Sequence, residues 1–102
     1  MATTLKAITS CLGYQQLETL TSSTGLTVPA RDPSTGLTAK ANFALITPEA
    51  KGVRWRDDGV APTASVGMPL AAGVTLQYDG DLTRIRFIEQ EATAKLNISY
   101  YV

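Results

Sequence analysis

Of the residues in this 102-residue chain, the aspartates have the types and spacing most compatible with cation binding or acid–base catalysis. Asp57 and Asp58 are adjacent, and Asp79 and Asp81 are separated by one glycine. If the fold brought these two pairs together, their oxygens would suit a Ca²⁺ ion, or the acid and base of a hydrolase. Aspartate beside glycine is also typical of turns, because the short carboxylate accepts nearby backbone hydrogen bonds. We favour the turn interpretation, and cation binding and acid–base catalysis are its alternatives.

Other catalytic and metal-binding chemistry is excluded by the residue types that the chain lacks. The sequence has no histidine and a single cysteine, Cys11. It therefore has no Ser–His or Cys–His pair for nucleophilic catalysis, and too few ligands for a zinc site. No glycine cluster precedes a helical pattern, as a phosphate-binding loop would require. We expect no enzymatic activity and no cofactor.

Residues 52–59 combine the only tryptophan with two arginines. In an extended strand, Val53 and Trp55 lie on one face, and Arg54 and Arg56 lie on the other. Large apolar side chains such as tryptophan contribute most to a small core, so the first face should be buried. The predicted core anchors are Trp55, Phe43 and Phe87.

The charged face of this stretch is the candidate contact surface. Arginine and tryptophan are frequent among the residues that dominate protein interfaces. The alternative for the arginines is a solvated sheet face with cross-strand ion pairs. The candidate interface residues are Arg54, Arg56, Asp57, Asp58, Arg84 and Arg86.

Short strands separated by turns would position these residues. Alternation of apolar and polar residues predicts four strands, around residues 53–56, 74–78, 84–87 and 96–100. An apolar run at 43–46 should end at Pro48, and Asp79 with Gly80 is typical of a tight hairpin between flanking strands. Residues 14–21 favour a strand over a helix, and any strand within 65–70 should be short or at a sheet edge.

These features predict one domain over residues 1–102, an all-β, compact antiparallel β-sandwich, jelly-roll-like, with six to eight short strands. Residues 1–12 form a short arm or a first strand. A turn-rich loop is expected at about residues 22–41. Inside it, the pentapeptide Ser-Thr-Gly-Leu-Thr occurs at 23–27 and again at 34–38. Two copies are too few for a solenoid, so we interpret them as reused turn chemistry or a local duplication.

Charge and hydropathy restrict the partners. Nine Lys and Arg residues balance nine Asp and Glu residues, so no field of one sign attracts nucleic acid. Near-zero net charge weakens mutual repulsion, which suits a protein that assembles. No apolar run reaches the length of a signal peptide or a membrane span. We expect a protein made in a cytoplasm, with no nucleic-acid partner and no membrane partner.

The second half of the chain resembles a family of small structural proteins of tailed bacteriophages and prophages. The resemblance covers about residues 42–102, with a shorter echo at 26–29. It rests on the motifs at residues 45–49, 53–59, 61–64, 67–70, 73, 81–82, 85–88 and 96–101. Residues 32–40 depart from the pattern as an added segment, so the role of the second pentapeptide is the least transferable part.

The resemblance implies a non-enzymatic virion component made in the cytoplasm of a bacterial host. A jelly-roll-like capsid decoration or cement protein, docked on or between capsid subunits, is similar to phage designs of this size. A neck, tail or baseplate accessory protein is the alternative, and in either case the partners are other virion proteins and further copies of the chain. From the residues alone, a further alternative is a carbohydrate-binding module that uses an exposed Trp55 with Asp57 and Asp58.

Overall fold

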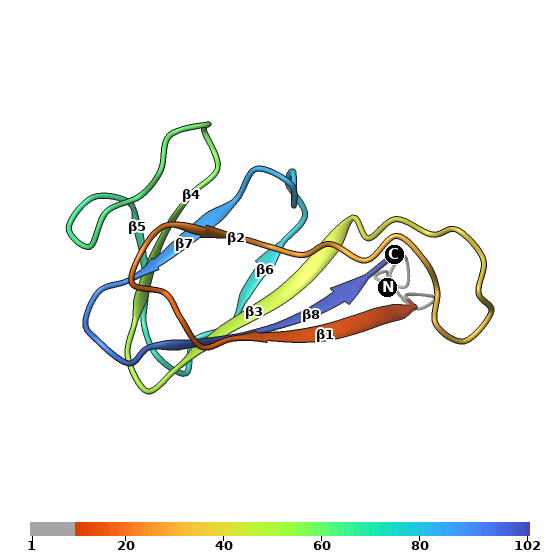
Figure 1. The fold of residues 1–102 in the computed structure, drawn as a ribbon, viewed down its shortest axis with the longest axis horizontal. Helices are drawn as coiled ribbons and strands as arrows, with labels where there is room; N and C mark the ends of the chain where they lie inside the picture. The colour runs from red at the N-terminus through yellow and green to blue at the C-terminus, as the bar shows by residue number, and fades with distance from the viewer. Residues whose placement is uncertain (1–9) are drawn as a thin grey trace, which may run out of the picture.

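The chain forms two antiparallel sheets of four strands each (Figure 1). The computed structural model describes residues 10–102, so most of the expected lead-in lies outside the described residues. The first sheet has the order β1-β8-β3-β6, and the second sheet has the order β2-β7-β4-β5. The strands are β1 Cys11–Leu17, β2 Thr24–Gly25, β3 Phe43–Glu49, β4 Val53–Arg56, β5 Met68–Leu70, β6 Leu76–Tyr78, β7 Arg86–Glu89 and β8 Lys95–Tyr101. Residues 10–102 contain no helix, and hence none that could cross a membrane, which confirms the all-β antiparallel prediction.

Strand pairing is nested around the β4–β5 connection. β4 pairs with β5, β3 with β6, β2 with β7 and β1 with β8, each pair antiparallel. The pairs β3·β8 and β4·β7 complete the two sheets. Only the β4–β5 connection stays within one sheet, and every other connection passes from one sheet to the other. Side chains from both sheets consequently meet in one hydrophobic cluster.

The prediction of a hairpin at Asp79 and Gly80 is wrong. β6 ends at Tyr78 in the first sheet, whereas β7 begins at Arg86 in the second, so the chain changes sheets here. Gly80 does not have the positive φ that a tight Asp-Gly hairpin requires. A Cβ atom at Gly80 would instead collide with the Tyr78 ring, so this glycine allows a close approach.

The core is built by alternation along the long strands. On β8, Leu96, Ile98 and Tyr100 are buried between partly exposed neighbours. Tyr100 is the largest fully buried side chain, and its hydroxyl donates a hydrogen bond to Gln15 Oε1 at 2.6 Å. Burial raises the pKa of Tyr100 from its ordinary value of 10 to about 12, so its hydroxyl keeps its proton even in mildly alkaline solution. The C-terminal strand therefore supplies the centre of the core.

The three predicted anchors have different environments. Phe87 has no exposed surface, and Trp55 is half-buried and packs against the core from its rim. Phe43 is not a core residue: its neighbour Ala44 faces the core, and successive strand side chains point to opposite faces. On the outer face of the first sheet, the Phe43 ring packs against Tyr101 at a centroid distance of 5.6 Å.

β3 continues through Pro48 to Glu49, although the sequence predicted that it would end at this proline. The Pro48 carbonyl accepts a hydrogen bond from Gly73 N at 2.8 Å. The N and the carbonyl of one strand residue point to the same side, so the Pro48 nitrogen faces this side of β3 too. Pairing between β3 and β6 ends at Ile46, before Pro48. Proline is tolerated in a strand where no ladder donor is needed. The missing N–H therefore costs no β3–β6 bond.

The two copies of the repeated pentapeptide have different structures. In the first copy, Thr24 and Gly25 form β2, and Leu26 packs against the core. In the second copy, Gly36 has a φ of 72° within a turn, and Leu37 is 68% exposed. The leucine of the pentapeptide therefore packs against the core in the first copy and projects into solvent in the second.

Candidate interface around Trp55

The candidate interface residues come from β4, β7 and the loops beside them. Arg56 on β4 lies directly opposite Arg86 on β7. Arg84 lies just before β7, and its guanidinium would be 2.8 Å from a Cβ atom at Gly59, so it reaches the loop that follows β4. The structure thus brings Arg56, Arg84 and Arg86 to one region, although residues 56 and 84 are far apart in the sequence.

Arg54 also has a structural role. Its side chain is half-buried, and it donates hydrogen bonds to the carbonyl oxygens of Ala64 at 3.1 Å and Gly67 at 2.9 Å. Both acceptors belong to residues 57–67, the loop between β4 and β5, which we call the 57–67 loop. Gly67 has a φ of 144°, and a Cβ there would approach the Arg54 Cβ to 3.2 Å. Arg54 therefore fastens the 57–67 loop to β4, and its place in the candidate interface stays a prediction.

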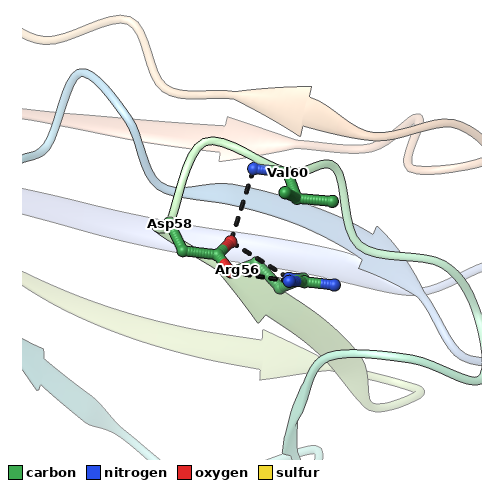
Figure 2. A network of polar contacts seen from close by, with 3 residues as sticks. All are labelled: Arg56, Asp58 and Val60. Carbon is green, nitrogen blue, oxygen red and sulfur yellow. Dashed lines mark hydrogen bonds and ion pairs between the residues drawn. The ribbon is translucent and has the colours of Figure 1, made fainter.

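Arg56 and Asp58 form a two-point ion pair at the start of this loop (Figure 2). Arg56 Nε donates to Asp58 Oδ1 at 3.0 Å, and Arg56 Nη2 donates to Asp58 Oδ2 at 2.6 Å. The Val60 amide also donates to Asp58 Oδ1, at 3.3 Å. These hydrogen bonds, that from Arg56 above all, lower the pKa of Asp58 to about 2. Asp58 is therefore a turn-forming carboxylate that stays ionised in mild acid.

The Asp58 titration gives a direct test of this geometry. We expect the Asp58 carboxyl to titrate at a pKa of about 2 in the native protein, measured by NMR. In Arg56→Gln it should move back toward its ordinary value of 3.8, because the charged donor is gone. Since the folded-state pKa is the lower one, the pair stabilises the fold fully above pH 3.8 and loses this contribution as the pH falls toward 2. An unchanged pKa in Arg56→Gln would contradict the pairing.

Asp57 turns away from Asp58 and toward the core. Its Oδ2 accepts a hydrogen bond from the Tyr78 hydroxyl at 2.6 Å. The Tyr78 ring meets Trp55 edge-on at a centroid distance of 6.0 Å. Burial first, and then the carboxylate of Asp57, raise the pKa of Tyr78 well above its usual value. Asp57, Tyr78 and Trp55 thus join β4 of the second sheet to β6 of the first.

Asp81 acts in the turn after β6. Asp81 Oδ1 accepts hydrogen bonds from the Thr83 amide at 2.9 Å and the Thr83 hydroxyl at 2.5 Å, and these bonds lower its pKa. Asp81 also adds to the raised pKa of Tyr78. No group of three metal-ligating side chains occurs within residues 10–102. Asp58 and Asp81 therefore shape turns, whereas Asp57 accepts a hydrogen bond from Tyr78.

A hollow of about 250 Å³, which we call the Trp55 hollow, opens beside these residues. It is lined by Trp55, Arg56, Asp57, Asp58, Val66, Gly67 and Met68. Val66 and Met68 are 52% and 56% exposed. Met68 is the register partner of Trp55 across β4 and β5, so both lie on the same sheet face. Val66 and Met68 are not among the predicted site residues. A stretch that contains glycine and proline does not show which of its apolar side chains stay in solvent.

No match to this chain was found among protein-family models, curated proteins or solved structures.

The arginines of β4, β7 and the turn before β7 are only partly neutralised. Arg56 and Arg86 are directly opposite in the register, where like charges destabilise a sheet. Asp58 neutralises Arg56, whereas Arg84 and Arg86 take part in neither of the two ion pairs within residues 10–102. An apolar hollow lined by a half-buried tryptophan and an arginine is typical of a protein-binding surface.

Proposed function

We propose that the two sheets form a jelly-roll β-sandwich. The nested pairs β4·β5, β3·β6, β2·β7 and β1·β8 support this. Rolling a long hairpin of four such pairs into two layers gives the orders 1-8-3-6 and 2-7-4-5, which are the strand orders of this chain. This architecture occurs in viral capsid proteins, lectins and cupins.

We propose that the protein is a non-enzymatic structural component of a tailed-phage virion, a decoration or cement protein on the capsid exterior. The nested strand order is the observation that carries this proposal, since it matches an architecture common in capsids. The phage-like motifs add support, because those at residues 53–59, 67–70, 85–88 and 96–101 coincide with β4, β5, β7 and β8. The protein would be made in the host cytoplasm and located in the virion.

The copy number in purified particles tests this function. Quantitative mass spectrometry of the phage that encodes the chain should find hundreds of copies per particle, because a decoration protein occupies every equivalent capsid position. Multiples of five, six or twelve copies would favour a neck, tail or baseplate accessory protein instead. Absence from purified particles would contradict every virion assignment.

A carbohydrate-binding module is the second candidate, and the Trp55 hollow favours it. A half-buried indole with apolar neighbours and adjacent carboxylates suits a sugar ring, whose face stacks on aromatic groups while its hydroxyls hydrogen-bond. Titration with glycans, followed by Trp55 fluorescence, tests this candidate. A saturable shift in the native protein, together with a calorimetric glycan-binding signal that Trp55→Phe abolishes, would support it, and no response to glycans would contradict it.

A further inference from the structure

Two aspartates of the chain, Asp58 and Asp79, are followed directly by glycine. At such a step the amide nitrogen of the glycine can attack the side-chain carbon Cγ of the aspartate, and glycine has no side chain that would block the approach. The attack requires a carboxyl group that is free to turn toward this nitrogen. The surroundings of the two carboxyl groups therefore decide which of the two steps can react.

The Asp58 carboxylate is held in place (Figure 2). Arg56 donates to both of its oxygens, at 3.0 and 2.6 Å, and the Val60 amide donates to Oδ1 at 3.3 Å. A carboxylate fixed by three donors is not free to turn toward the Gly59 amide. The same hydrogen bonds lower the pKa of Asp58 and keep it ionised. An ionised carboxylate is a poor electrophile, because the oxygen that must leave carries no proton.

Asp79 has no such partners. Asp79 and Gly80 are both exposed, and they lie outside β6 and β7, so no strand ladder fixes them. Within residues 10–102, the Asp79 carboxylate takes part in neither ion pair and accepts no hydrogen bond. In the same part of the chain, the Gly80 amide donates no hydrogen bond to the main chain. Both reacting groups are therefore free to approach each other.

We propose that Asp79 is a site of spontaneous isomerisation to isoaspartate, and that Arg56 protects Asp58 from the same reaction. The Gly80 nitrogen forms a bond to Cγ of the protonated Asp79 carboxyl group, and the bond from Cγ to the hydroxyl oxygen breaks. The hydroxyl group leaves with the amide proton as water, which gives a succinimide ring. A solvent water molecule then opens the ring. Opening at Cγ restores aspartate, whereas opening at the main-chain carbonyl carbon of Asp79 gives isoaspartate, whose main chain is one methylene longer.

The added methylene acts on the candidate interface, because Gly80 packs against Tyr78. A Cβ atom at Gly80 would lie only 2.6 Å from Tyr78 Cζ. The Tyr78 hydroxyl donates to Asp57 at 2.6 Å, and the Tyr78 ring meets Trp55 edge-on. A longer main chain displaces Gly80 from this ring and loosens the contact between Tyr78 and Trp55. The reaction proceeds in the purified chain and does not depend on the virion assignment.

Peptide mapping of the aged protein tests the site. The native chain is incubated in mildly acidic buffer and digested, and isoaspartate is located by mass spectrometry with electron-transfer fragmentation. We expect isoaspartate at Asp79 to exceed that at Asp58 several-fold. In Arg56→Gln, isoaspartate at Asp58 should rise toward the level at Asp79, while the level at Asp79 stays the same. No isoaspartate at Asp79, or equal amounts at both aspartates of the native protein, would overturn the proposal. An unchanged level at Asp58 in Arg56→Gln would overturn the protection by Arg56.

Trp55 fluorescence tests the effect of the reaction on the candidate interface. As isoaspartate accumulates, the Trp55 emission should shift to longer wavelength, because the Tyr78 ring covers the indole less well. Asp79→Glu is the matched control: it keeps the charge, but its side chain would have to close a larger ring, which forms far more slowly. Its emission should stay constant over the same incubation. Unchanged emission in an isomerised native protein, or an equal shift in Asp79→Glu, would overturn the link from Asp79 to Trp55.

Discussion

Phe87→Ala should destabilise the folded protein by about 3–5 kcal/mol, a large part of the stability of a domain this small. Phe87 has no exposed surface and lies opposite Trp55 in the β4–β7 register. Removing its ring would leave a cavity that the rigid strands on both sides cannot fill. Urea unfolding followed by circular dichroism measures the change in the free energy of unfolding.

Phe43→Ala is the matched control, because it removes the same ring from the other phenylalanine of the chain. Phe43 is partly exposed on the outer face of the first sheet and lies outside the core cluster. We expect a cost of about 1–2 kcal/mol. Trp55→Ala should fall between the two, since its half-buried indole lies at the rim of the core. A larger loss for Phe43→Ala than for Phe87→Ala would contradict the assignment of the two sheet faces.

Arg54→Met should cost about 1–2 kcal/mol, because it leaves the carbonyl oxygens of Ala64 and Gly67 without their charged donor. Methionine keeps the length and apolar stem of the side chain, so the loss reports the hydrogen bonds. The 57–67 loop should also become more mobile, and faster amide hydrogen exchange in residues 63–67 measures this.

Arg86→Met serves as the control for Arg54→Met. Arg86 is exposed on the same sheet face and faces Arg56, so its removal also relieves a like-charge contact. Its effect on the free energy of unfolding should stay within about 0.5 kcal/mol. Equal destabilisation by the two substitutions would contradict a fastening role for Arg54.

The sequence predicted the strands whose alternation is strict. Leu96, Ile98 and Tyr100 on β8 are buried in the expected pattern, and the short edge strand β5 also lies where the sequence placed it. Alternation shows which residues share a face, but it does not say which sheet a strand joins. For that reason Asp79 and Gly80 predicted a local hairpin, whereas β6 and β7 pair with strands far away in the sequence.

The candidate site was predictable only in part. The aspartates were expected to form turns, and Asp58 and Asp81 accept backbone hydrogen bonds within two residues of their own positions. Such contacts depend on local sequence. The attachment of Arg54 to the 57–67 loop, the Asp57–Tyr78 hydrogen bond and the Trp55 hollow depend on how distant segments pack, which one sequence does not specify.

Cryo-electron microscopy of particles that lack this protein, with the purified chain added back, tests the virion assignment most directly. If the protein decorates capsids, density of its size should appear at every equivalent position on the outer surface of the head. The density should disappear when the chain is left out. Density confined to the neck or tail would contradict the decoration role, and particles without added density would contradict a virion role altogether.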